Sequence, residues 1–590
     1  MNILIDTVRV AGFRGIKNLE MSLSPVTVLI GTNNSGKTSV LKAMQLALGD
    51  YSRYLSEEDF HIDADEKRVQ EILIDIRIVP VDDNGKRKQL FDNIWVIEFE
   101  DKIKAEANGN QFLALRTRCK TDFIKGGFEV LRFTLEKWLE VDTWQTEKVK
   151  EIKMSSRFLS IPFISIEAQR DIHQELKDKS SFVGKVLSSV EYNQSDVNEL
   201  ELLIKGINEE AVKKSTELQG LKTHLDNLNQ SFQGAGSAEI TPFPKKIRDL
   251  SKNFSIHFGE SSGNSFSMEY HGMGTRSWAS MLTVKAFTDL MVAKHEKEVE
   301  PFFPIIATEE PEAHLHPNAQ KTIYHQLVDS KGQVIISTHS PYLAAMTDVS
   351  YIRSLRREST GIVANMLTHK ISGEDKKILA REITIKRGEI LFSRALVLCE
   401  GITEEQVLPA MFEMYSGKSL YSLGICCISV GGKNYSPFVR LACSLGIPTF
   451  IVSDNDGSTN REIEAQLRRL QKDTNLVLGP DKFGISYLTS GNDFEAELLL
   501  HTRLKEEIIS ALVLSETNGS ENQRYRAAKL KEITALTEQD ILLKMRESKA
   551  AYAGFLADVL RENPNNRMVD ALLPTAVINA FNVVEGWLSI

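Results

Sequence analysis

One short stretch constrains the fold of this chain more than any other. The pattern G-x-x-x-x-G-K-T occupies residues 31–38, between an apolar run and an apolar-periodic run ("VTVLIGTNNSGKTSVLKAMQLAL"). In a strand–loop–helix context, the loop N–H groups and the helix N-terminus cradle phosphates, Lys37 reaches the β and γ phosphates, and Thr38 holds Mg²⁺. The sequence therefore predicts an α/β P-loop domain that uses ATP and Mg²⁺. The other expected nucleotide-binding residues are Asn33, Asn34, Ser35, Gly36 and Ser39.

Length and composition limit the alternatives. A chain of 590 residues exceeds what one hydrophobic core supports, so two to four domains are expected. The chain shows no signal peptide and no run of about 18 apolar residues, so we expect a cytoplasmic protein without a membrane span. The five cysteines form no C-x-x-C pair and are predicted to be reduced core residues. The net charge of −9 argues against a surface coated in cations, although local acid can mask a basic groove.

The chain is predicted to contain two α/β sections with a helical insertion in the first. Residues 1–168 and 254–370 read as two parts of one head, interrupted by residues 169–253. A linker, 371–390, leads to a second section, 391–590, which is expected to end in a helical C-terminal part. The insertion carries a helical stripe, which favours a hairpin for self-association, with a plain satellite bundle as the alternative. The stripe consists of Val197, Leu200, Leu203, Ile207, Leu218, Leu221, Leu225 and Leu228.

A second acidic motif completes the expected ATPase site. In "FFPIIATEEPEAHLHP", Glu309 is placed to hold the Mg²⁺ shell and Glu310 to orient or deprotonate the attacking water. A third apolar strand, "GQVIISTHSPYL", ends in His339, which could contact the γ phosphate. His314 and His316 lack further spaced ligands, so a role in a turn or interface is favoured over metal binding.

The order of "FRGI", "GTNNSGKT", "HGMGTRSWASML", "EEPEAHLHP" and "STHSP" resembles the ABC-type ATPase heads of the RecF and SMC group. The resemblance implies that Gly272, Gly274 and Ser277 form a signature loop that completes the ATP site of a partner subunit. It also implies that His339 is the switch histidine. Glu309 replaces the aspartate common in ABC proteins, as is typical of the RecF-like branch.

The second section places acids at the ends of two apolar strands. Glu400 follows "RALVLC" and precedes a turn at Gly401 and a helix that begins near Glu404; Asp454 and Asp456 follow "IPTFIVS". Strand ends of an open parallel sheet converge on one crevice, and side chains two apart in extended chain share a face. Four such carboxylates would be neutralised by two Mg²⁺ or Mn²⁺ ions, which together can cleave a phosphodiester. The alternatives are an ordinary Asp/Asn/Gly loop and helix charge compensation.

The motifs E-G-x-T-E, G-G-K (residues 431–433) and D-x-D-G resemble the Toprim domain. A Toprim domain after an ABC head resembles the OLD (overcoming lysogenization defect) family of ATP-dependent endonucleases, which includes Gabija-type and retron-associated nucleases. By this resemblance Asp493 and Glu495 are further metal-binding acids, and Lys549 is the lysine that aids catalysis. The alternative for Lys549 is a solvated helix lysine.

These observations predict an ATPase-coupled, metal-dependent DNA endonuclease. The resemblance further implies a homodimer or larger assembly, defence against phage, and a defence-system partner, either a protein or a retron RNA and DNA. The main rival is a RecF-like ATP-driven DNA clamp whose Toprim residues do not cut. A third possibility is a head that senses nucleotide and restrains the nuclease.

Overall fold

The computed structural model divides the chain into two compact units, and each is described separately. The first unit comprises residues 1–3, 80–101 and 157–336, and the second comprises 4–79, 102–156 and 337–590. The described residues are 2–63, 65–122, 126–167, 193–231, 242, 257–258, 266–267, 272–367, 373–379, 388–474, 476–562 and 572–588.

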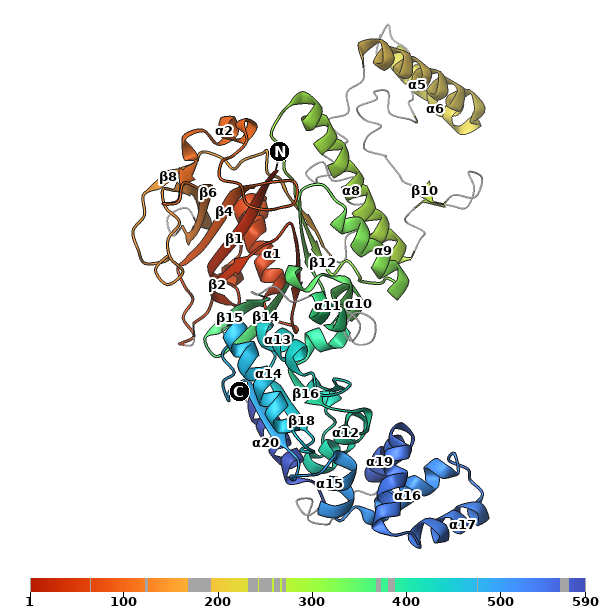
Figure 1. Ribbon diagram of the computed structural model, residues 1–590. Coiled ribbons are helices and arrows are strands. Elements are labelled where there is room, and N and C mark those ends of the chain that lie inside the picture. Colours follow the sequence, from red (N-terminus) through yellow and green to blue (C-terminus); the bar gives the residue numbers. More distant parts are fainter. Residues whose placement is uncertain are drawn as a thin grey trace. The chain divides into compact units, whose positions relative to one another are not determined.

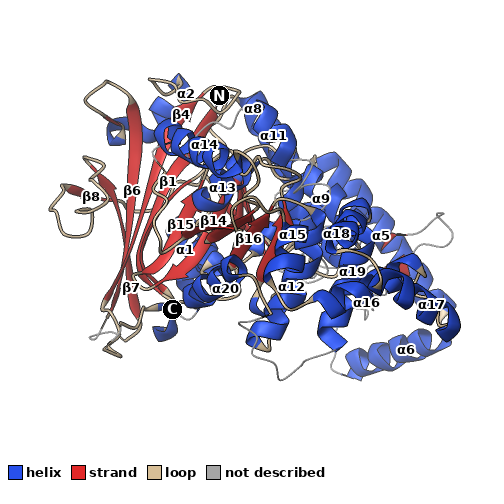
Figure 2. Ribbon diagram, turned by 60° about the horizontal axis from the view of Figure 1, so that its bottom comes forward, coloured by secondary structure: helices blue, strands red, loops and turns tan. Residues whose placement is uncertain are grey.

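The second unit begins with a largely antiparallel sheet, in the order β2-β1-β4-β6-β7-β8, with β5 paired to β6. Its long strands are buried along most of their length, as expected of β-branched runs in a sheet. Figure 2 shows β1, β4, β6 and β7 side by side. The strands are β1 (Asn2–Phe13), β2 (Ile16–Ser22), β4 (Glu71–Val81), β5 (Lys104–Ala105), β6 (Gln111–Thr121), β7 (Phe128–Leu135) and β8 (Glu151–Lys153).

The P-loop follows a fully buried strand, β3 (Val26–Ile30), and leads into α1 (Lys37–Leu48). β3 pairs in parallel with β14 (Ile352–Glu358), and β14 forms an antiparallel hairpin with β15 (Gly361–Met366). The helix α10 (Pro341–Met346) precedes this hairpin in the chain. The predicted strand–loop–helix context of the P-loop is therefore present.

The second α/β section, residues 391–590, is called the Toprim section after the motifs that it carries. It contains a four-stranded, all-parallel sheet in the order β17-β16-β18-β19. A helix follows each of the first three strands in sequence, as in a doubly wound α/β fold. The strands are β16 (Ala395–Cys399), β17 (Ile425–Ser429), β18 (Thr449–Ser453) and β19 (Phe483–Tyr487). The helices that follow β16, β17 and β18 are α12 (Ile402–Ser416), α13 (Ser436–Ser444) and α14 (Thr459–Thr474).

The C-terminal helices share one hydrophobic core with the Toprim sheet. Val397 of the sheet, Met411 of α12, Leu556 of α19 and Phe581 of α20 are each at most 1% exposed and belong to the same buried cluster. Helix α19 packs on α12 and α16, and α20 packs on β18 and β19 (Figure 1). The predicted α/β fold class, with a helical C-terminal part, is confirmed. The helices are α15 (Phe494–His501), α16 (Lys505–Glu516), α17 (Gln523–Thr534), α18 (Glu538–Glu547), α19 (Lys549–Glu562) and α20 (Thr575–Leu588).

The first unit contains the strands that carry the second acidic motif. β12 pairs in parallel with β9, and β13 lies on the other side of β12. Helices α8 and α9 flank β12 in sequence. The elements are α2 (Asn93–Phe99), β9 (Phe163–Ile166), β10 (His257–Phe258), β11 (Phe266–Ser267), α8 (Met273–Glu298), β12 (Ile305–Glu309), α9 (Pro317–Val328) and β13 (Gln333–Ser337).

The predicted helical insertion is described in part, as two contacting helices, α5 (Gln194–Lys214) and α6 (Thr216–Ser231) (Figure 1). Several apolar side chains of the predicted stripe are exposed: Leu200 37%, Leu203 59%, Ile207 55% and Leu221 49%. Residues 168–192, and most of residues 232–256, lie outside the described part of the chain. The role of the insertion and the boundaries of the domains remain predictions.

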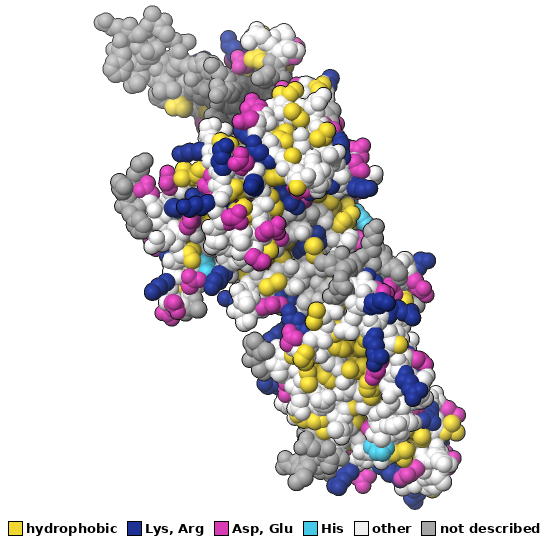
Figure 3. All heavy atoms as spheres, turned by 60° about the vertical axis from the view of Figure 1, so that its left-hand side comes forward, with side chains coloured by type: hydrophobic (Ala, Val, Ile, Leu, Met, Phe, Trp, Pro, Cys, Tyr) yellow, Lys and Arg dark blue, Asp and Glu magenta, His cyan; other side chains and the backbone are white. Residues whose placement is uncertain are grey.

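None of the five cysteines, all of which lie in the described part of the chain, forms a disulfide. Cys119 and Cys399 are buried core residues, as predicted, whereas Cys426, Cys427 and Cys443 are only partly buried. None of the described helices combines the length and the apolar character needed to cross a bilayer. On the face drawn in Figure 3, acidic and basic side chains are interspersed.

Candidate active site

The Toprim acids lie at the carboxyl edge of the parallel sheet. Glu400 directly follows β16, and Asp454 directly follows β18. The two strands are adjacent, and their register pairs Leu398 with Ile451, so Glu400 and Asp454 leave the same edge. Glu404 lies in the first turn of α12, where its Oε1 accepts a hydrogen bond from the Gly401 N–H at 3.2 Å. The predicted convergence of these acids is present.

Two loops hold the acidic residues in place through backbone hydrogen bonds. In the G-G-K loop, the Gly432 N–H donates to the Glu400 carbonyl at 3.0 Å, and Gly431 and Gly432 both have positive φ, which favours glycine. In the D-x-D loop, the Asn455 N–H donates to the Asn492 carbonyl at 3.0 Å. The second contact ties the D-x-D loop to the turn that carries Asp493.

Two carboxylates in this group carry a buried oxygen that accepts no hydrogen bond: Oε2 of Glu400 and Oδ1 of Asp454. Asp454 is only 8% exposed. Burial, together with the nearby charges of Glu404 and Glu400, raises the pKa of Asp454 to about 9. Burial raises the pKa of Glu404 to about 7, with a contribution from Glu495, and it also raises the pKa of Glu400. These groups therefore resist ionisation unless a cation lies close to them.

The remaining acids each have their own cation. Asp456 accepts a hydrogen bond from Lys433 Nζ at 3.0 Å, and one from Thr459. The bond from Thr459, and then the one from Lys433, lowers the pKa of Asp456. Arg546 Nε donates to Asp493 Oδ2 at 2.8 Å, while Asp493 Oδ1 accepts from the Ala496 N–H at the start of α15. Both oxygens of Asp493 are thus engaged.

Glu495 is buried at 1% exposure and contacts the predicted catalytic lysine. Its Oε1 accepts from Thr403 Oγ1 at 2.8 Å, and its Oε2 lies 3.3 Å from Lys549 Nζ. Although burial opposes the effect, Glu495 raises the pKa of Lys549, so the amine is charged at neutral pH. About half of the Lys549 side chain is exposed. Lys549 is therefore a cation within the acidic group rather than a distant surface lysine.

The donor set fits a divalent cation. Buried carboxylate oxygens without hydrogen-bond donors suit hard ions such as Mg²⁺ and Mn²⁺. Among the described residues, no lysine or arginine forms an ion pair with Glu400, Glu404 or Asp454, whereas Asp456, Asp493 and Glu495 each have one. The first three residues are therefore the strongest candidates to hold metal.

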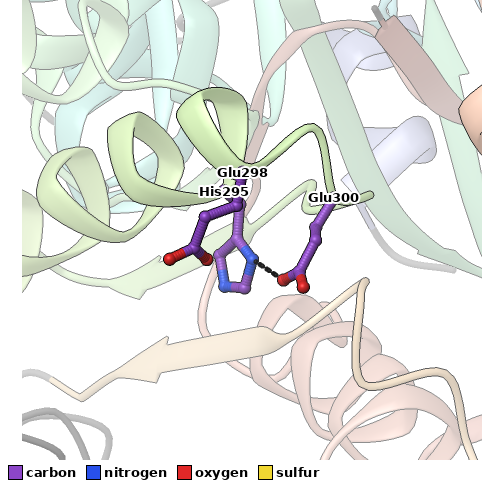
Figure 4. Close-up of side chains that lie close together, drawn as sticks. All are labelled: His295, Glu298 and Glu300. Carbon is purple, nitrogen blue, oxygen red and sulfur yellow. Dashed lines mark hydrogen bonds and ion pairs between the residues drawn. The ribbon is translucent and has the colours of Figure 1, made fainter.

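A different cluster in the first unit has the tightest geometry for a metal. Among the described residues, only His295, Glu298 and Glu300 offer three ligand atoms that all lie within 4.8 Å of one another (Figure 4). His295 Nδ1 lies 2.9 Å from Glu300 Oε2, and its ring stacks on Phe302. Both glutamates are exposed at the end of α8. The contacts of His295 with Glu300 and Phe302 explain why these side chains lie together at the C-terminal end of α8 without requiring a metal.

The P-loop has the geometry of a phosphate-binding turn. Gly36 has a φ of 95° and immediately precedes α1, so the first N–H groups of the helix face the loop. Lys37 is buried, and its Nζ donates to the carbonyls of Gly31 and Thr32, each at 2.9 Å. The Thr338 N–H donates to the Leu29 carbonyl of β3, which places the next residue, His339, beside the P-loop strand.

The other predicted ATPase residues belong to the first unit. Glu309 ends β12, and Glu310 follows with a φ of 45°. Gly272 precedes α8, Ser277 is buried within it, and a Cβ on Gly274 would lie 2.3 Å from the His314 carbonyl. His314 has positive φ, and His316 Nδ1 accepts from the Asn318 N–H at the start of α9. The two histidines therefore shape a turn, as predicted.

The sequence did not single out four contact residues of the Toprim site. Thr403 and Lys433 lie inside the motifs E-G-x-T-E and G-G-K, which could have indicated them. Thr459 follows D-x-D-G by two residues. Arg546 has no such signal, because its contact with Asp493 spans 53 positions.

Comparisons with known proteins agree with the presence of two parts in this chain, an ATPase head and a Toprim section. The family model described as "AAA ATPase domain" matches residues 4–344, and the one described as "Overcoming lysogenization defect protein-like, TOPRIM domain" matches residues 391–456. The Old nuclease of Escherichia phage P2 is 25% identical over 488 residues, which cover 78% of each chain. The endonuclease GajA of Bacillus cereus is 21% identical over 509 residues, covering 74% of this chain and 71% of GajA.

Among solved structures, the C-terminal region of the Burkholderia pseudomallei OLD protein is similar to this chain, at 24% identity and a TM-score of 0.25. The match covers 33% of this chain and 99% of that structure. The ATPase family model alone spans more than half of the 590 residues. The chain therefore belongs to the AAA ATPase domain family and, with its OLD-like TOPRIM domain, has the architecture of the OLD family, as its motifs predicted.

Proposed function

We propose that this protein is an ATP-hydrolysing, divalent-metal-dependent DNA endonuclease. The observation that carries the proposal is the pair of buried carboxylate oxygens, on Glu400 and Asp454, that accept no hydrogen bond at the carboxyl edge of the Toprim sheet. A buried carboxylate without donors is costly unless a cation or a proton neutralises it. The relatives from phage P2 and Bacillus cereus are named as nucleases, which supports the same activity here.

Glu400, Glu404 and Asp454 would hold Mg²⁺ or Mn²⁺, with Asp456 and Glu495 completing the acidic group. Bound divalent ions supply an activated water and charge stabilisation for phosphodiester hydrolysis. Lys433 and Lys549 each neutralise one acid at the edge of the group. The Lys549 side chain is half exposed, and in our proposal its amine donates a hydrogen bond to the DNA phosphate.

At the ATPase site, the P-loop residues would bind the nucleotide, with Lys37 on its phosphates and Thr38 on Mg²⁺. Glu309 and Glu310 would serve the ion and the attacking water, and His339 the γ phosphate. Gly272, Gly274 and Ser277 would act on the ATP of a second copy of the chain. In this proposal the protein is a homodimer or larger assembly, held in part by the exposed apolar residues of α5 and α6.

ATP binding or turnover would control the access of DNA to the Toprim site. We extend the proposal to a cytoplasmic role in defence against phage, with a protein or a retron RNA and DNA as a partner. The rival function is a DNA clamp that binds ATP without cutting. The rival function gives the buried oxygens of Glu400 and Asp454 no role in catalysis.

Incubation with supercoiled plasmid separates the two functions. We expect Mn²⁺ or Mg²⁺ to support nicking or linearisation by the purified full chain, and we expect Asp454→Asn to abolish it. Asp473→Asn is the matched control, because Asp473 is an exposed aspartate on α14 of the same domain. An intact plasmid with the wild-type protein and either metal, with and without ATP, would favour the clamp.

A further inference from the structure

A pocket of about 450 Å³ lies beside the P-loop, within the second unit. The head contributes Gly31, Thr32 and the end of β14 to its lining, and the Toprim section contributes the rest. None of the Toprim acids lines this pocket. Its volume is in the range of sites that bind one small molecule the size of a nucleotide.

The lining carries an excess of positive charge. Four cations, Arg356, Arg357, Arg394 and Lys482, face two acids, Glu358 and Asp481. Of these four cations, only Lys482 forms an ion pair with another described residue, Glu358, at 2.7 Å. The formal net charge of the lining is therefore two positive.

Two of these arginines are held by carbonyl groups rather than by acids. Arg356 donates to the carbonyls of Leu445 and Ser393, and Arg394 donates to the carbonyl of Leu588. Burial lowers the pKa of Arg356 to about 10, which leaves it charged at neutral pH. Carbonyl contacts orient a guanidinium without neutralising it, so the positive charge stays available to an anion.

Much of the remaining lining is apolar and includes a tryptophan. Leu391, Phe392, Pro448, Trp587 and Leu588 contribute this surface. The Trp587 Nε1–H donates to the Pro480 carbonyl at 3.1 Å, which fixes the orientation of the indole. A cationic part for phosphate beside an aromatic and apolar part for a base is the combination that a nucleotide requires.

We propose that this pocket is a second nucleotide site, in which Arg357 and Arg394 bind the phosphates and Trp587 contacts the base. Lys37 is not among the lining residues, although Gly31 and Thr32, whose carbonyls accept from Lys37, are. We therefore place the ligand beside the phosphate position served by Lys37, and the proposal does not depend on the nuclease function proposed above. A Cβ on Gly31 would lie 2.4 Å from the Leu355 carbonyl, so the first P-loop residue packs on the backbone just before Arg356. A ligand in the pocket therefore lies against the wall that supports the P-loop.

Isothermal titration of the full chain with ADP tests the proposal. The wild type is expected to bind two ADP per chain, and the variant Arg357→Glu/Arg394→Glu one, with affinity at the lost site at least tenfold weaker. In the Lys37→Ala background we expect one ADP to remain bound, and the double charge reversal to remove it. Arg461→Glu, an exposed arginine on α14 outside the pocket, is the matched control and should bind like the wild type.

Three results would overturn the proposal: one ADP per wild-type chain, two ADP per chain in the double variant, or loss of all ADP binding in Lys37→Ala. Binding of a single-stranded oligothymidylate in place of ADP, lost in the double variant, would also overturn it and assign the pocket to nucleic acid. The two proposals fail separately, because plasmid cutting by the wild type tests the nuclease without any change to the pocket.

Discussion

The unpaired carboxylate of Asp454 predicts that the metal-free protein becomes more stable when this residue is replaced by asparagine. Asp454→Asn keeps the size of the side chain and removes its ability to ionise. The pKa of Asp454 is about 9 in the folded protein, against an ordinary value of 3.8. Because the unfolded chain ionises more readily, Asp454 lowers the stability of the fold as pH rises above about 4, and this loss levels off above about 9.

The size of the effect follows from these pKa values. At pH 7 the solution lies about three pH units above the unfolded pKa, and each unit corresponds to about 1.4 kcal/mol, so the cost is about 4 kcal/mol. At pH 5 the same reasoning gives only about 2 kcal/mol. For a domain of about 200 residues these costs correspond to rises in Tm of about 10 °C and about 5 °C in the variant.

Thermal melts in EDTA, followed from pH 5 to pH 8, measure this difference. Asp454→Asn should melt above the wild type, and the gap should narrow as pH falls. Addition of Mn²⁺ should raise the Tm of the wild type and leave that of the variant nearly unchanged, while Asp473→Asn should follow the wild type throughout. A variant that melts at or below the wild type in EDTA at pH 7, or a gap that does not narrow toward pH 5, would refute the electrostatic reasoning.

Three further predictions concern cations of the two sites. Lys549→Met should slow plasmid cutting by about 100-fold while Mn²⁺ still raises the Tm, because the amine contacts Glu495 rather than an unpaired acid; equal cutting rates would contradict this. Arg546→Gln should raise the Mn²⁺ concentration for half-maximal cutting by about tenfold, with partial rescue by Arg546→Lys, because it orients Asp493; an unchanged Mn²⁺ titration would exclude that role. Lys37→Ala should reduce ATP hydrolysis by about 100-fold and leave the Mn²⁺-dependent rise in Tm unchanged; undiminished turnover, measured by phosphate release, would show that the P-loop is not the hydrolytic site.

Local sequence patterns predicted those elements of the fold that are determined by a short run of consecutive residues. The P-loop strand, its turn and α1 follow from a buried apolar run, two glycines and a helical period. Two of the four Toprim strands, β16 and β18, followed from apolar runs that end in acids. The pairing order β17-β16-β18-β19 could not be read in this way, because strand neighbours depend on packing among segments far apart in the chain.

At the candidate site, too, local features were predictable and long-range contacts were not. Glu400 and Asp454 were predictable, because parallel strands deliver their following residues to one edge. The sequence could not predict which acids form an ion pair with a lysine or arginine. Lys433, Arg546 and Lys549 contact acids that lie 23 to 54 positions away in the chain. Sequence spacing treated all of these acids as equivalent ligands, whereas the contacts separate those that already have a cation from those that lack one.

The end of β14 contacts both the P-loop and the Toprim section. Gly31 packs on the carbonyl of Leu355, and the next residue, Arg356, donates hydrogen bonds to the carbonyls of Leu445 and Ser393 in the Toprim section. These contacts are made by backbone atoms and a partly buried guanidinium, which have little freedom to absorb a displacement. In our proposal, a shift of the P-loop on ATP binding would be transmitted to the Toprim section through β14, in addition to the covalent linker that the sequence predicted. A short, closely packed connection of this kind is the physical condition for control of one site by the other.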